Sequence, residues 1–179
     1  MSESSSYDTL GRHFRTPAHP DVLVALGRAN YTFLSLEETV VAILYDAQFL
    51  DLDQSRILTA GRKVDMLRSL AKRYRRSKNG KDVALIIDNA IRAFDDVRGT
   101  VRNRLFHAQP FTAGVDDNGD YLPGLAYTGQ DKDTKNIVRA TLADKPGDLL
   151  DLTETIEAAI DPLSAAREAV SALPVTRLT

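Results

Sequence analysis

The chain has 179 residues, of which 43% are hydrophobic and 27% are charged, and this balance predicts one ordinary globular domain with its own core. It contains no cysteine, which excludes a disulfide scaffold, a thiolate metal site and a cysteine nucleophile. The net charge of -2 and the pI near 5.9 argue against a uniformly basic nucleic-acid binder but leave room for local basic patches.

Residues 1–19 are polar and predict a flexible lead-in to a single domain over residues 20–179. His13 and His19 lie in this segment, and without a third ligand nearby they are interpreted as surface histidines. The first residues lack a basic region followed by an apolar run, and no uncharged apolar stretch approaches the ~20 residues of a membrane span. We therefore expect a cytoplasmic protein with no membrane contact.

The first predicted helix runs from Pro20 or Asp21 to about Phe49, because proline suits the first turn and an acidic residue beside it is favoured by the helix dipole. Its expected buried face carries Leu23, Leu26, Phe33, Val40, Val41 and Leu44 at helical spacing. Glu37 falls on that face. A carboxylate there either reaches an edge or is paired inside the protein with an arginine of the third helix, and the sequence favours neither.

The second predicted helix covers roughly Gln54 to Ser77. Its core positions are Ile57, Val64, Leu67, Ala71 and Tyr74. The other side is unusually basic, with Arg62, Lys63, Arg68, Lys72, Arg73, Arg75, Arg76, Lys78 and Lys81. Such a run is usually a solvated face, but it also predicts a phosphate-binding surface, beside which Tyr74 would stack a base only if it were exposed.

The third predicted helix follows the turn at Asn79-Gly80 and ends near His107. Asp95, Arg98 and Arg102 are spaced by three and four residues, so they can pair with one another. Arg102 and His107 diverge by about 140 degrees on an ideal helix, because five residues turn through about 500 degrees. Their convergence would require unwinding near His107 or a second copy of the helix across a two-fold axis.

In the sequence Arg102-Asn103-Arg104-Leu105-Phe106-His107, an arginine with a permanently charged guanidinium is followed by a histidine that can carry a proton. Pro110, three residues later, is expected to end the helix. The order Arg-Asn-x-x-x-His, at the end of a helix that follows two long amphipathic helices, resembles the HEPN domains (higher eukaryotes and prokaryotes nucleotide-binding). That resemblance implies an all-helical fold, a homodimer and, in many members, metal-independent RNA cleavage in a toxin-antitoxin or phage-defence setting.

The resemblance implies that Arg102 and His107, contributed by both subunits, would form the cleavage site without a metal or cofactor. Arg102 would hold phosphate oxygens, His107 would transfer protons, and Asn103 would orient His107 or donate to phosphate. The RNA backbone would follow the basic side of the second helix. The residues expected to bind RNA are Arg68, Lys72, Arg75 and Arg76, and those expected to support the site are Glu37, Asp95 and Arg98.

Residues 110–143 predict a β-hairpin or meander inserted after the third helix, with short strands at 111–115, 121–128 and 137–142 and a tight reversal at Asn118-Gly119. The last predicted helix covers about Leu149 to Leu173 and should be kinked or split at Asp161-Pro162. Its inward positions are Leu149, Leu152, Ile156, Ile160, Leu163, Ala166 and Val170.

These elements predict a mainly α protein, an up-and-down bundle of four to five helices with a short β insertion. The alternative to a ribonuclease is a non-catalytic helical module that dimerises and binds a nucleotide or a protein partner such as an antitoxin. In that case Arg102 would pair with Asp95 or Glu37, and His107 would only cap its helix. A sequence-specific DNA binder is disfavoured, because no helix-turn-helix is recognisable.

Overall fold

The computed structural model describes residues 20–115, 117, 119, 121–130, 134–143 and 146–178. The predicted lead-in at residues 1–19, with its two histidines, lies outside the described residues. The chain divides into two compact units. One comprises the described parts of Met1–Asn30 and Arg102–Glu154, and the other comprises Tyr31–Val101 and the described part of Thr155–Thr179.

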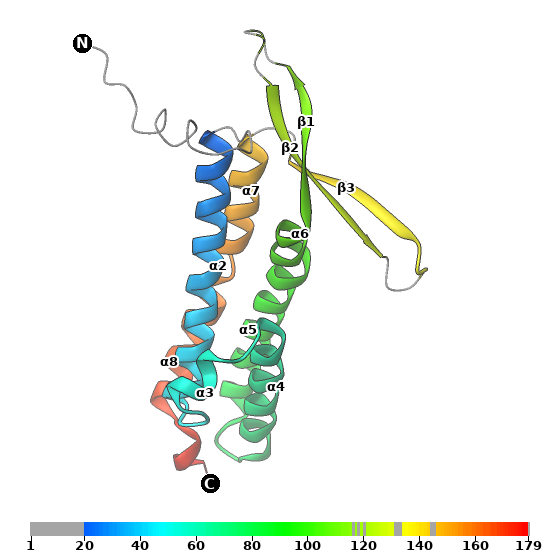
Figure 1. Cartoon of the computed structure of the whole chain (residues 1–179). Coiled ribbons are helices and arrows are strands. Elements are labelled where there is room, and N and C mark those ends of the chain that lie inside the picture. The colour runs from blue at the N-terminus through cyan, green and yellow to red at the C-terminus, as the bar shows by residue number, and fades with distance from the viewer. Residues whose placement is uncertain are drawn as a thin grey trace, which may run out of the picture. The chain divides into compact units, whose positions relative to one another are not determined.

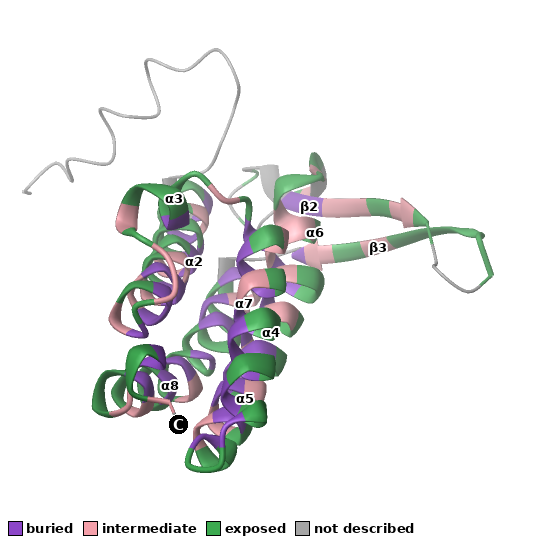
Figure 2. Cartoon of the chain, turned by 90° about the horizontal axis from the view of Figure 1, so that it is seen from below, coloured by how far each residue is buried: buried purple, intermediate pink, exposed green. Residues whose placement is uncertain are grey.

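Helices build the second unit. They are α2 (Pro20–Asp46) from Tyr31 onward, α3 (Leu52–Arg56), α4 (Ala60–Arg76), α5 (Lys81–Val97) and α8 (Ile160–Ala172), followed by the 3-10 turn η2 (Val175–Arg177) (Figure 1). Buried residues run along one side of α4 and of α5 (Figure 2). At the centre, the rings of Phe33 and Phe94 stack with centroids 5.7 Å apart. The predicted inward faces of these helices are confirmed at most positions.

The prediction of one continuous second helix is wrong, because the helix is interrupted at residues 57–59. Asp51 accepts a hydrogen bond from the backbone N–H of Gln54 and starts α3, and Thr59 accepts one from the N–H of Arg62 and starts α4. Ile57 therefore lies in the break and is 84% exposed instead of buried. Each of the two helices thus has its own N-terminal cap, although the apolar periodicity continues across the break.

Tyr74 is fully buried on α4, and its hydroxyl donates a hydrogen bond to the backbone carbonyl of Leu173. The ring is therefore a core residue and is not available to stack on a base. Burial raises the pKa of Tyr74 to about 12, because the phenolate would lose its hydration inside the protein.

Tyr74 should make the protein lose stability in alkali. Below pH 10 the phenol keeps its proton in both states, whereas between about pH 10 and 12 only the unfolded chain releases it. The free energy of unfolding should therefore fall by about 2 to 3 kcal/mol over that interval. Urea unfolding at about pH 9 and about pH 12 measures this change. Tyr74→Phe should lack this component of the loss, and equal losses in both proteins would contradict the assignment.

The first unit contains the predicted β insertion, so the mainly α fold with a short sheet after the third helical region is confirmed. The strands β1 (Ala108–Val115), β2 (Tyr121–Gln130) and β3 (Ile137–Ala143) form an antiparallel meander in the order β1-β2-β3 (Figure 1). Gly119, in the turn between β1 and β2, has a φ of +86°, a conformation that glycine adopts without strain.

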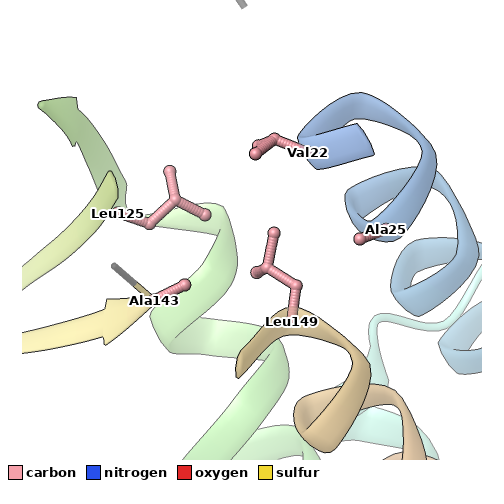
Figure 3. Close-up of a cluster of buried hydrophobic side chains, with 5 residues drawn as sticks. All are labelled: Val22, Ala25, Leu125, Ala143 and Leu149. Carbon is pink, nitrogen blue, oxygen red and sulfur yellow. The ribbon is translucent and has the colours of Figure 1, made fainter. Parts of the chain in front are cut away.

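A small apolar cluster joins the sheet to helices within the first unit (Figure 3). It consists of Val22 and Ala25 from the first turns of α2, Leu125 from β2, Ala143 from β3 and Leu149 from α7 (Pro146–Glu157). Leu105 and Ala108, just before and at the start of β1, pack against it. The cluster thus fixes the point at which the helical chain turns into the sheet.

The predicted interruption of the last helix is confirmed, since α7 ends at Glu157 and α8 begins at Ile160. Pro162 lies in the first turn of α8, where its missing N–H has no intrahelical partner to lose. Leu23 and Ile160, both predicted to be buried, are exposed. Among the described residues, no helix combines the length and the apolar character that crossing a bilayer requires.

Candidate functional site

The predicted motif lies where helical structure gives way to the sheet. After α5 the chain forms a π-helical segment, η1 (Arg98–Arg102), then the short helix α6 (Asn103–Phe106), and β1 starts at Ala108. A π-helix bonds each residue to one five positions away, so it alters the angular spacing that an ideal α-helix would give. Such segments occur frequently at functional sites.

Arg102 is held by its two neighbours in α6. Its Nη1 donates a hydrogen bond of 3.2 Å to Oδ1 of Asn103, and its guanidinium carbon lies 4.5 Å from the centre of the Phe106 ring. A guanidinium over an aromatic face gains about 0.5 to 1 kcal/mol and loses freedom to rotate. This contact holds the Arg102 side chain along α6, over the ring of the residue that precedes His107.

His107 ends α6 and is exposed to solvent. Its backbone N–H donates to the carbonyl oxygen of Asn103 at 3.3 Å, which leaves the imidazole itself outside the helix hydrogen-bonding pattern. An accessible imidazole can exchange protons with a bound ligand in the physiological pH range. Asn103 therefore has two structural contacts, its side chain with Arg102 and its carbonyl group with the backbone of His107.

The predicted supporting residues form separate ion pairs within the second unit. Asp95 accepts a hydrogen bond of 2.9 Å from Nε of Arg98, which confirms the expected pair along the helix, and another of 2.9 Å from Nη2 of Arg68 on α4. Glu37 lies 3.5 Å from Nζ of Lys63 on α4. The expectation that Glu37 binds an arginine of the third helix is therefore wrong, because its partner is a lysine of the second.

The four residues expected to bind RNA fall into two pairs. Arg68 and Arg75 bridge α4 to α5 through Asp95 and Asp88, so each already has a carboxylate partner. Lys72 and Arg76 lie one turn apart, exposed, and no carboxylate in the described part of the chain pairs with either. The cationic surface available to a polyanion is therefore on the solvent side of α4 and excludes the edge that faces α5.

Two open hollows occur elsewhere in the second unit, and neither is lined by a motif residue. The larger, of about 730 Å³, lies beside the C-terminal end of α2 and includes Tyr45, Phe49 and Arg177 in its lining. The smaller, of about 560 Å³, includes Thr39, Asp46 and Arg167. Within the described ranges no cluster of three or more His, Asp or Glu residues could hold a metal ion.

Sequence reasoning missed two residues that the structure brings to these positions. Phe106 is four residues after Arg102, a spacing at which helical side chains meet, so the cation-π contact was open to prediction. Lys63 lies four residues before Leu67 on the buried face of α4, and this position could have marked it as the partner of a buried acid.

Comparison with known proteins provides no further assignment: no protein-family model, no curated protein and no solved structure matches this chain.

Proposed function

We propose that this protein is an HEPN-like RNA endonuclease that works without a metal, acts as a homodimer and serves a toxin-antitoxin or phage-defence role. The proposal is supported above all by the side chain of Arg102, which Asn103 and Phe106 hold in the same short segment that ends at the exposed His107. The segment therefore combines an oriented guanidinium, which can bind phosphate, with an accessible imidazole, which can carry a proton.

Cleavage would use the 2'-hydroxyl of the RNA as nucleophile. Its oxygen attacks the adjacent phosphorus, the bond to the 5'-oxygen breaks, and the products carry a cyclic phosphate and a free 5'-hydroxyl. One base must take the proton of the 2'-hydroxyl and one acid must supply a proton to the leaving oxygen. His107 of one subunit can serve as base and His107 of the other as acid, which gives a chemical reason for a dimer.

Arg102 would stabilise the charge that develops on the phosphate during this reaction. Its planar group can bind two phosphate oxygens at once, and Asn103 and Phe106 restrict it before the substrate arrives. Asn103 acts in this proposal chiefly as a positioning residue for Arg102. Lys72 and Arg76 would attract the RNA backbone.

A second candidate function is a non-catalytic module that dimerises and binds a nucleotide or protein partner. It is favoured by the ion pairs of Arg68 and Arg75, which reduce the charge available to RNA, and by the lining of the two hollows, which includes no motif residue. Under this alternative the contact of Arg102 with Phe106 only stabilises the end of the helix.

Incubation of a mixed RNA pool with the purified protein in EDTA tests the proposal. The wild type is expected to produce fragments with a cyclic phosphate end, and Arg102→Ala is expected to cut at least ~100-fold more slowly, as when a donor to transition-state charge is removed. Cleavage that requires a divalent metal, or that persists equally in Arg102→Ala, would overturn the proposal and favour the binding module.

Lys72 and Arg76 should account for much of the salt dependence of nucleic-acid binding. Each phosphate contact contributes about 0.7 to the slope of log affinity against log salt for a single strand. Lys72→Ala/Arg76→Ala should therefore lower that slope by about 1.4, measured by fluorescence anisotropy with an oligonucleotide that lacks the 2'-hydroxyl. Arg68→Ala/Arg75→Ala is the matched control and should change the slope less. Equal changes in the two double variants would contradict the conclusion that Lys72 and Arg76, and not Arg68 and Arg75, bind the phosphates.

A further inference from the structure

The two edges of the three-stranded sheet differ in how well they are protected. β1 carries Pro110, which has no N–H to offer a neighbouring strand, and its register with β2 shifts between Thr112 and Gly114. A proline and a bulge are devices by which sheets block pairing with other chains. The edge of the sheet formed by β1 is therefore poorly suited to pair with a strand of another chain.

β3 has a register shift of its own near its end, between Thr141 and Ala143, but neither a proline nor a bulge over residues 137–141. This stretch pairs with residues 126–130 of β2 in unbroken register, and the sequence Ile137 to Ala143 contains no proline and one charge, on Arg139. Its first two side chains are β-branched and apolar, yet Ile137 is 75% exposed and Val138 is 43% exposed. A regular, weakly charged strand with uncovered apolar residues offers its free backbone groups to another strand.

We propose that the free edge of β3 pairs antiparallel with β3 of a second copy of this chain, so that the two sheets become continuous. When a strand pairs with the same strand of a second copy, a two-fold axis relates the two strands and places one residue opposite the same residue of the partner. A strand with a small uncharged residue at the middle suits that arrangement, and β3 has Ala140 there.

Charge selects the register. With Ala140 on the axis, Arg139 lies opposite the partner's uncharged Thr141, so no like charges face each other directly. With Arg139 on the axis, two guanidinium groups would lie directly opposite each other, which destabilises an antiparallel pair. Self-pairing of β3 is therefore favoured in the register centred on Ala140 and disfavoured in the register centred on Arg139.

Substitutions at Thr141 test the proposal, because this residue is exposed and each dimer contains two contacts between positions 139 and 141. Thr141→Lys should raise the dissociation constant of the dimer by about 2- to 30-fold, as two unfavourable cross-strand pairs predict, and Thr141→Glu should lower it. Arg139→Glu/Thr141→Lys should restore it toward the wild-type value. Sedimentation equilibrium of the full chain over a range of concentrations provides the measurement.

Gln109→Lys is the matched control, since it adds the same charge to the edge formed by β1 and should leave the dissociation constant unchanged. A chain that stays monomeric throughout would overturn the proposal and point to a strand from another protein. A dimer that responds equally to Gln109→Lys and Thr141→Lys would overturn it as well.

The absence of cysteine from the chain allows a direct test of the register. Residues directly opposite in an antiparallel pair have Cβ atoms about 4.5 to 5.5 Å apart, close to the reach of a disulfide. Ala140→Cys should form a disulfide-linked dimer on mild oxidation, and Gln109→Cys should remain monomeric on a reducing-agent-free gel. Crosslinking of Gln109→Cys but not of Ala140→Cys would refute the pairing.

This pairing does not depend on RNA cleavage. β1, which begins directly after His107, and β3 are opposite edges of the sheet, so the β3 pairing and the dimeric cleavage site are separate contacts. An intact dimer that fails to cut RNA would count against the proposed function alone, whereas an active monomer would count against the pairing and against the dimeric site.

Discussion

Replacing His107 by alanine is expected to lower the rate of RNA cleavage by about 100- to 10,000-fold, the range found when a general acid or base is removed. The fold should survive, because the side chain is exposed at the end of a short helix, where a cation contributes at most about 1 kcal/mol. Initial rates at saturating RNA in EDTA, with circular dichroism of the same samples, measure both effects.

Arg104→Ala is the control for this experiment. Arg104 is also exposed in α6 but belongs to neither the phosphate clamp nor the proton carrier, so its loss should change the rate by no more than a few-fold. Arg102→Lys adds a second check, since lysine keeps the charge but lacks the planar fork that binds two oxygens. Full activity in His107→Ala would remove the proposed catalytic role of the motif.

Replacing Glu37 by alanine is expected to lower the free energy of unfolding by about 3 kcal/mol. Lys63 keeps only 7% of its side chain exposed, so without Glu37 its ammonium group would remain buried without a counter-charge. The loss should fall at the lower end of the range for broken buried pairs, because 19% of the Glu37 side chain is exposed. Urea unfolding at neutral pH measures it.

The double variant Glu37→Leu/Lys63→Met separates the cost of an unpaired charge from the value of the pair. It removes both charges and keeps similar volumes, so its stability should return to within about 1 kcal/mol of the wild type or exceed it. Arg167→Ala, which breaks the more exposed pair with Asp46, should cost less than about 1 kcal/mol. Equal losses in Glu37→Ala and in the double variant would mean that lost packing, and not an unpaired charge, causes the loss of stability.

Helical periodicity predicted most of the secondary structure because burial repeats with the period of the element. Phe33, Leu67 and Tyr74 are buried as that spacing required, and the sequence Asn118-Gly119 correctly indicated that the strands on either side of it are antiparallel. The same periodicity failed at Ile57, where the pattern continues but the cap at Thr59 starts a new helix. A local hydrogen bond determined the break, and a search for caps inside the apolar pattern could have found it.

The ion pairs show most clearly which contacts the spacing of residues in the sequence can predict and which it cannot. The pair between Asp95 and Arg98 could be predicted, because three residues along a helix determine the distance between two side chains. By itself the sequence determined most of the elements, most of their buried positions and such contacts within one helix. Only the tertiary structure decided that Glu37 binds Lys63 and that Arg68 and Arg75 are bound by acids of α5, leaving Lys72 and Arg76 exposed. Contacts between helices depend on how the helices pack, and the spacing along one chain does not specify that packing.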